Sequence, residues 1–167
     1  MKRIILASGS PRRRELLREA GFIFDTEISD IKETIGDRTP AETVKELSLQ
    51  KAADISGRHE EDCIVIGSDT VVAYRGSILG KPVSKEEAYD MIGMLEGETH
   101  QVYTGVTIIF RQDGMEKTVT FHEETDVTLY PMSKKEIHDY IEYGKNTLPR
   151  QQIKWFFYYL SFSIHMV

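Results

Sequence analysis

Hydrophobic and polar positions along the chain predict strands and helices that alternate. A short apolar run over residues 2–7 predicts a first strand, and the alternation over Phe22–Ile28 is typical of a half-buried second strand. Cys63–Ile66 is apolar throughout, as in a buried strand. Val102–Phe110 and Lys117–Leu129 predict two long strands later in the chain.

Helix start signals lie between these strands. Ser10 followed by Pro11 predicts the N-cap and first turn of a helix that carries Leu16 on its inner face. Three further helices are predicted by capping boxes, in which a Ser or Thr is followed three residues later by Glu. The three pairs are Thr39 with Glu42, Ser84 with Glu87 and Ser133 with Glu136. This interleaving predicts an α/β domain with a mixed sheet.

Turn residues join the remaining segments. Asp113-Gly114 is a hairpin signal between the two long strands, and Arg75-Gly76 predicts a tight turn that pairs Val71–Tyr74 with Ser77–Leu79. Gly67-Ser68-Asp69-Thr70 follows the apolar run directly, which predicts the end of that strand.

Composition narrows the classes of protein to which the chain can belong. Of the 167 residues, 40% are hydrophobic and 29% charged, which suits one globular domain or two small lobes. The net charge of −6 argues against coating nucleic acid or an anionic membrane. With Cys63 alone, no internal disulfide can form, and no apolar run is long enough to predict a membrane span or a signal peptide. We therefore expect a cytoplasmic protein.

The composition changes sharply near residue 145. Residues 145–167 contain no acidic residue, three basic residues and six of the chain's sixteen aromatic residues. This change predicts a domain over residues 1–144 and an atypical C-terminal tail over 145–167.

The segment from Ser8 to Arg14 is the most informative chemically. It joins a predicted strand to a helix N-terminus, where free N–H groups and the helix dipole favour an anion. Arg12, Arg13 and Arg14 oppose that dipole, and a bound phosphate would resolve the conflict. The alternative is a solvated basic turn. The segment lacks the Gly-Lys-Ser/Thr ending of a Walker loop.

Other charged residues are weaker candidates when each is taken alone. Asp69 follows a buried strand, where a carboxylate can act as general base or metal ligand, or simply form a turn. Lys81 in Gly80-Lys81-Pro82 supplies a charge beside a flexible glycine, yet it also fits a plain turn. Lys51 and Glu33, each taken alone, fit solvated surface residues better than site residues. The five histidines show no metal-ligand spacing, and Cys63 reads as a core residue.

Taken together, several of these blocks resemble the Maf family in both order and spacing, over about residues 2–144. They are Ala7-Ser8-Gly9-Ser10-Pro11-Arg12-Arg13, Ser29-Asp30-Ile31-Lys32-Glu33, Lys51-Ala52, Gly67-Ser68-Asp69-Thr70, Leu79-Gly80-Lys81-Pro82 and Val102-Tyr103-Thr104-Gly105-Val106. The resemblance implies an inosine-triphosphatase-like α/β fold, in which an elongated mixed sheet flanked by helices forms two lobes around a cleft.

The resemblance also implies a function. Maf proteins are nucleoside triphosphate pyrophosphatases that clean the nucleotide pool, releasing a monophosphate and pyrophosphate with a divalent cation (Mg²⁺ or Mn²⁺). By this resemblance Asp69 is the proton acceptor, and Glu33 and Asp69 are candidate metal ligands. The substrate-binding residues would be Ser8, Arg12, Arg13, Glu33, Lys51, Thr70 and Lys81.

The resemblance extends to substrate and partners. Arg12 and Thr70 match the dTTP/UTP branch of the family, which implies those pyrimidine nucleotides, and modified ones, as substrates. It also allows for a homodimer, with no nucleic acid or membrane partner. Residues 145–167 depart from the family pattern, which predicts a truncated or frameshifted C-terminus. The alternative function is a catalytically impaired, nucleotide-binding regulator linked to septum formation and cell division.

Overall fold

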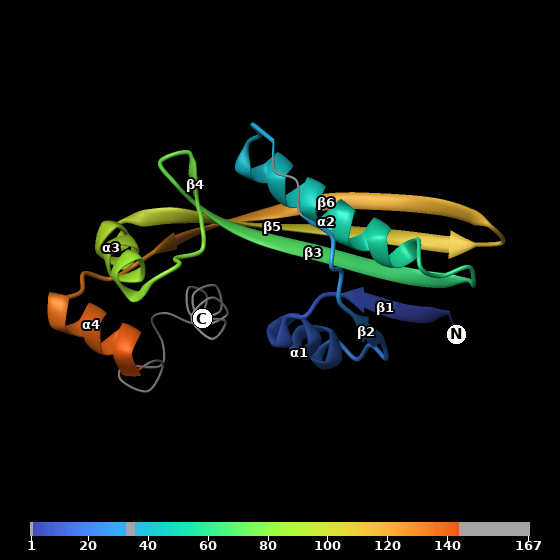
Figure 1. The fold of residues 1–167 in the computed structure, drawn as a ribbon, viewed down its shortest axis with the longest axis horizontal. Coiled ribbons are helices and arrows are strands. Elements are labelled where there is room, and N and C mark those ends of the chain that lie inside the picture. The colour runs from blue at the N-terminus through green and yellow to red at the C-terminus, as the bar shows by residue number, and fades with distance from the viewer. Residues whose placement is uncertain (1, 33–35, 144–167) are drawn as a thin grey trace. The chain divides into compact units, whose positions relative to one another are not determined.

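The computed structural model describes residues 2–32 and 36–143, and there the chain forms a mixed α/β fold, as predicted. Figure 1 shows how its helices and strands are arranged. In chain order the elements are β1 (Arg3–Ala7), α1 (Pro11–Glu19), β2 (Asp25–Glu27), α2 (Pro40–Ser56), β3 (Cys63–Tyr74), β4 (Ser77–Leu79), α3 (Lys85–Leu95), β5 (Thr99–Gln112), β6 (Met115–Thr128) and α4 (Lys134–Tyr143).

The six strands formed by the described residues belong to one mixed sheet. Its order is β2-β1-β3-β5-β6, and β4 pairs with β3. β1 runs parallel to both β2 and β3, whereas β4 is antiparallel to β3. The tight turns predicted at Arg75-Gly76 and Asp113-Gly114 are confirmed, because all four residues have positive φ angles between 49° and 81°.

The chain divides into two compact units. The first comprises the described residues up to Val71 together with Tyr103–Glu124, and the second comprises Val72–Val102 together with the described residues from Thr125 to Tyr143. The core of the first unit lies between the sheet and α2, and it consists of Ile5, Ala7, Ala52, Ile55, Cys63, Val65 and Ile109. In the second unit α3 packs against α4. The core there consists of Tyr74, Ile92, Leu95, Leu129, Ile137 and Tyr140.

Helix α2 begins where the capping box predicts. The Thr39 hydroxyl accepts a hydrogen bond from the Glu42 N–H at 3.3 Å, and the Glu42 carboxylate accepts one from the Thr39 N–H at 3.0 Å. The helix then buries an apolar stripe that includes Val44, Leu47 and Ile55. This long helix, which carries Lys51, therefore has a fixed start and a fixed inner face.

The segment after β1 departs from the predicted pattern. Only Asp25–Glu27 pairs with β1, and the side chains of Phe22 and Ile23 on the preceding segment are exposed. In α1, all of whose residues are described, no side chain is buried, and Leu16 is 40% exposed. The predictions of a half-buried strand over the whole of Phe22–Ile28 and of a buried helix face at Leu16 were therefore wrong.

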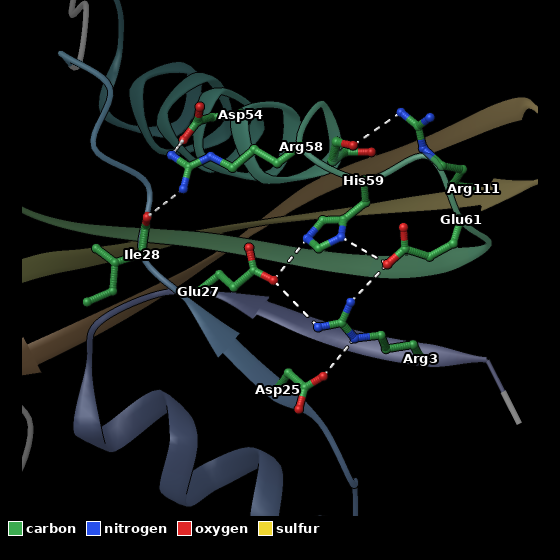
Figure 2. A network of polar contacts seen from close by, with 10 residues as sticks. Arg3, Asp25, Glu27, Ile28, Asp54, Arg58, His59, Glu61 and Arg111 are labelled. Atoms are coloured by element: carbon green, nitrogen blue, oxygen red, sulfur yellow. Dashed lines mark hydrogen bonds and ion pairs between the residues drawn. The ribbon is translucent and has the colours of Figure 1, made fainter.

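Charged side chains join the start of β1 to its neighbours (Figure 2). Arg3 donates hydrogen bonds to Asp25 at 2.7 Å and to Glu61 at 2.9 Å. His59 lies between two carboxylates, with Nε2 2.9 Å from Glu27 and Nδ1 3.1 Å from Glu61. The pKa of Glu61 is lowered by a backbone hydrogen bond, then by His59, and least by the hydrogen bond from Arg3. This network ties β2 and the segment before β3 to β1.

Cys63 is fully buried at the start of β3, and its burial raises the pKa of the thiol. This supports its assignment to the core. No helix within the described residues is long and apolar enough to cross a bilayer. The predicted tail, residues 145–167, lies outside the described residues.

Candidate active site

The candidate site lies where β1 ends and β3 continues. The parallel pairing of these strands stops at Ala7, which is opposite Gly67. β3 runs on to Tyr74, so the segment predicted to be a turn, Gly67–Thr70, is the middle of a 12-residue strand. In open α/β sheets, ligands bind at the carboxyl ends of parallel strands. Asp69 is thus beside such an end, although its own strand does not stop there.

Helix α2 lies directly against β3 at this point. A Cβ atom at Gly67 would be 2.3 Å from the Ser48 carbonyl oxygen and 2.8 Å from the Ala52 nitrogen, so only glycine fits. Because alternate residues of a strand share a face, Asp69 also points towards α2. There the Asp69 carboxylate accepts a hydrogen bond from the Lys51 ammonium group.

The Lys51–Asp69 pair is largely removed from water. The two side chains are 18% and 14% exposed. Opposite charges at such depth are tolerated in proteins when they are paired. Each side chain therefore orients the other, and Lys51, predicted to bind phosphate, has the carboxylate of the predicted base as a direct partner.

On the neighbouring position, Thr70 contacts a different helix. Arg13, in the first turn of α1, donates from Nη2 to the Thr70 hydroxyl at 3.2 Å. Its Nη1 donates to the Ser68 carbonyl oxygen at 2.8 Å and to the Ser8 hydroxyl at 3.2 Å. Arg13 therefore joins the loop after β1 to the middle of β3.

The Ser8 hydroxyl accepts hydrogen bonds in these contacts and can still donate its own proton. Its hydroxyl oxygen accepts from Arg13 and from the Ser10 backbone N–H, the latter at 3.2 Å. A hydroxyl accepts two hydrogen bonds and donates one, so the proton of Ser8 remains for a further acceptor. Such a donor beside an arginine and a helix N-terminus suits a phosphate oxygen.

The first turn of α1 has the character predicted for an anion site. It contains no acidic residue, and the Ser10 side chain makes no capping hydrogen bond. Arg12, however, forms an ion pair with Glu15 at 2.7 Å, one turn along the helix. Arg12 therefore has a partner within its own helix, and Arg13 contacts β3.

Comparison with known proteins shows the family of the chain. A family model described as Maf-like protein matches residues 3–150. The chain belongs to the Maf family. Among curated Maf relatives, a protein of Bacillus cereus (strain G9842) and one of Bacillus anthracis (strain CDC 684 / NRRL 3495) are each 49% identical over 142 residues. Both matches cover 84% of this chain and 72% of the relative, and both relatives are named dTTP/UTP pyrophosphatase.

Solved structures support the fold of this Maf family member. A HAM1 protein from Coxiella burnetii matches with a TM-score of 0.53 at 13% identity, covering 77% of this chain and 73% of that one. The Ham1 protein of Staphylococcus aureus matches with a TM-score of 0.52 at 15% identity, covering 77% and 72%. These likenesses extend to the fold alone.

One predicted site residue belongs to the second unit, and another lies outside the described residues. Lys81 belongs to the second unit, where it is exposed between β4 and α3. Glu33 lies outside the described residues. One residue that the sequence reasoning left without a role is Thr104, whose hydroxyl is 3.1 Å from that of Thr70. Its only sequence signal was membership of the block from Val102 to Val106.

The described site residues could hold a divalent cation if the phosphates of a substrate supplied some of its ligands. Within residues 2–32 and 36–143, no group of three or more His, Cys, Asp and Glu side chains is arranged to hold a metal. Mg²⁺ commonly binds through one or two carboxylates and the phosphates of its substrate. Asp69 can supply one such carboxylate, which its hydrogen bond from Lys51 holds in place.

Proposed function

We propose that this chain is a nucleoside triphosphate pyrophosphatase that hydrolyses dTTP and UTP to the monophosphate and pyrophosphate. The relatives named dTTP/UTP pyrophosphatase, which match 84% of the chain at 49% identity, are the observation that carries the proposal. They favour an enzyme over a regulator that only binds nucleotides. The polar clusters on β3 offer a chemical route to this reaction.

Asp69 is the proposed proton acceptor. Water adds to one phosphorus of the α–β bridge, its proton passes to the Asp69 carboxylate, and the bond to the bridging oxygen breaks. The products are the nucleoside monophosphate and pyrophosphate, and the proton returns to solvent. Lys51, bonded to Asp69, holds the carboxylate in a fixed orientation for this transfer.

Cationic and hydroxyl groups are proposed to bind the triphosphate. Arg13, Lys51 and Lys81 would offset its negative charge, with Ser8 donating a hydrogen bond to a phosphate oxygen. A divalent cation, Mg²⁺ or Mn²⁺, supplies further positive charge when bound, and Asp69 is its proposed ligand among the described residues, with Glu33 as a second.

Substrate choice is assigned to residues beside this cluster. Arg12 and Thr70 are proposed to favour pyrimidine nucleotides, and Thr70 is held by Arg13 at 3.2 Å. We further propose that the protein is cytoplasmic. We also propose that it forms a homodimer, which gel filtration of the full chain tests.

Pyrophosphate release from dTTP and UTP with Mg²⁺ tests the function. Asp69→Asn keeps the size of the side chain and removes its basicity, so we expect turnover to fall by about 10²- to 10⁴-fold. Asp54→Asn is the matched control, because Asp54 is also paired with a cation, Arg58 at 2.7 Å, but lies outside the site. It should keep wild-type turnover to within about twofold.

Three results would contradict the proposal. The first is an unmodified protein that releases no pyrophosphate from either nucleotide. The second is an Asp69→Asn variant as active as the control. The third is 7-methyl-GTP turned over much faster than dTTP, which would place the substrate outside the pyrimidine class.

A further inference from the structure

Thr104 lies on β5 opposite the candidate site residue Thr70. Its neighbour Gly105 meets the backbone of α2, where a Cβ atom would be 2.1 Å from the Val44 carbonyl oxygen. Because neighbouring residues of a strand point to opposite faces, Thr104 points away from α2. That is the face on which Arg13 reaches Thr70, and the two threonine hydroxyl oxygens are 3.1 Å apart.

The direction of the hydrogen bond between Thr104 and Thr70 decides whether Thr70 keeps a proton for a ligand. A guanidinium group can only donate, so the Thr70 oxygen accepts from Arg13. One acceptor position and one proton of Thr70 then remain. If Thr104 donates, it fills the acceptor position and Thr70 keeps its proton for a ligand. If Thr104 accepts, it takes that proton and Thr70 is left to accept.

We infer that Thr104 is a positioning residue, whose hydroxyl fixes the orientation and the proton of the Thr70 hydroxyl beside Arg13. The inference rests on the proposed function, in which Thr70 and Arg13 contact the nucleotide. Among the oxygens that accept from Arg13, the Ser68 carbonyl is fixed by the strand, whereas the Ser8 and Thr70 hydroxyls belong to side chains that can rotate. The hydrogen bond with Thr104 restricts the rotation of the Thr70 hydroxyl.

This arrangement matches the chemistry of a pyrimidine nucleotide. Uracil and thymine rings carry carbonyl acceptors and one N–H donor, with either of which an oriented Thr70 hydroxyl would form a hydrogen bond. A hydroxyl free to rotate would lose part of that advantage in binding. The chemical step itself does not involve Thr104, which makes substrate affinity the quantity that should change.

The test uses the full chain with Thr104→Val, which keeps the shape of the side chain and removes the hydroxyl. We expect the KM for dTTP and UTP to rise about two- to tenfold, the effect of losing one neutral hydrogen bond, with kcat within about twofold of wild type. Thr104→Ser, which keeps the hydroxyl, should restore KM. In a Thr70→Val background, Thr104→Val should cause no further change.

Thr99→Val is the matched control. Thr99 lies on the same strand, and its hydroxyl forms a similar pair with that of Thr128 at 2.7 Å. KM and kcat should stay at wild-type values in this variant, and the melting temperatures of the variants at Thr104 and Thr99 should agree.

The outcomes separate the two claims. An unmodified chain that does not cleave dTTP or UTP overturns the proposed function and this inference together. If that chain is active, then an unchanged KM in Thr104→Val overturns the inference alone. A KM for Thr104→Ser as high as that for Thr104→Val also overturns the inference. The same holds if Thr104→Val raises KM as much in the Thr70→Val background as it does in the wild type.

Discussion

The contact between β5 and helix α2 leads to a sharp prediction at Gly105. A Cβ atom there would lie 2.1 Å from the Val44 carbonyl oxygen, 2.3 Å from the Val44 carbonyl carbon and 2.9 Å from the Lys45 nitrogen. Ordinary van der Waals contact begins near 3.4 Å. Because these are backbone atoms of a helix, Gly105→Ala forces α2 and β5 apart by about 1 Å in a closely packed interior.

The displacement should disturb two other contacts of the same helix. Ser48 and Lys51 follow Val44 by one and two helical turns, so they lie on the same side of α2. Ser48 shares a buried hydrogen bond with Thr107 of β5 at 2.9 Å, and Lys51 is bonded to Asp69. Overpacking of this kind costs about 1–3 kcal/mol, to which a weakened buried hydrogen bond adds about 1 kcal/mol.

We therefore expect Gly105→Ala to lower the free energy of unfolding by about 2–4 kcal/mol. It should also reduce turnover of dTTP by about 10- to 100-fold, since shifts near 1 Å at a catalytic group have effects of that order. Urea denaturation followed by circular dichroism measures the first quantity, and pyrophosphate release measures the second at a temperature where the variant is folded.

Gly93→Ala provides the matched control. Gly93 lies inside α3, and a Cβ atom there would meet no atom within 4 Å. Because alanine favours the helix, this variant should be more stable by about 0.5–1 kcal/mol and fully active. A Gly105→Ala protein with wild-type stability and turnover would refute the reasoning that Gly105 allows α2 to pack closely against the sheet.

Two further predictions concern single side chains. Hydrogen bonds from Thr39 lower the Glu42 pKa, so the ionised carboxylate stabilises the folded protein above its unfolded pKa, and this contribution is lost as the pH falls through the lowered folded pKa. Glu42→Gln should therefore be less stable than wild type at pH 7 and should converge with it in urea titrations once the pH falls below the lowered folded pKa of Glu42, whereas a pH-independent difference would contradict this. Arg13→Lys should raise the KM for dTTP about tenfold or more, because lysine cannot bridge Ser8 and Thr70, and Arg12→Lys should change it less. Equal effects of the two substitutions in steady-state kinetics would be evidence against a separate role for Arg13.

Features that depend on a few neighbouring residues could be predicted from the sequence. The capping box at Thr39 and the hairpin at Asp113-Gly114 form as predicted. Each is decided within about four residues, by a side chain that satisfies a nearby backbone group or by a turn that needs positive φ angles. The alternation of such signals was enough to predict the α/β class.

Features that depend on strand pairing could not be predicted in this way. The alternation over Phe22–Ile28 suggested a strand, yet only Asp25–Glu27 finds a partner in β1. Gly67–Thr70 has the composition of a turn, but it continues β3 because β5 is paired along the other side of that strand. A strand requires a neighbour to pair with, and that neighbour comes from a distant part of the sequence.

The sequence thus determined which residue types were available for chemistry, and the tertiary structure decided how they are grouped. Asp69 and Thr70 are adjacent in the chain, yet strand alternation sends one to Lys51 of α2 and the other to Arg13 of α1. The role of Thr104 became visible only when β5 brought its hydroxyl to Thr70. Local patterns carry information about helix ends and turns, whereas contacts between distant residues exist only after the strands have taken their register.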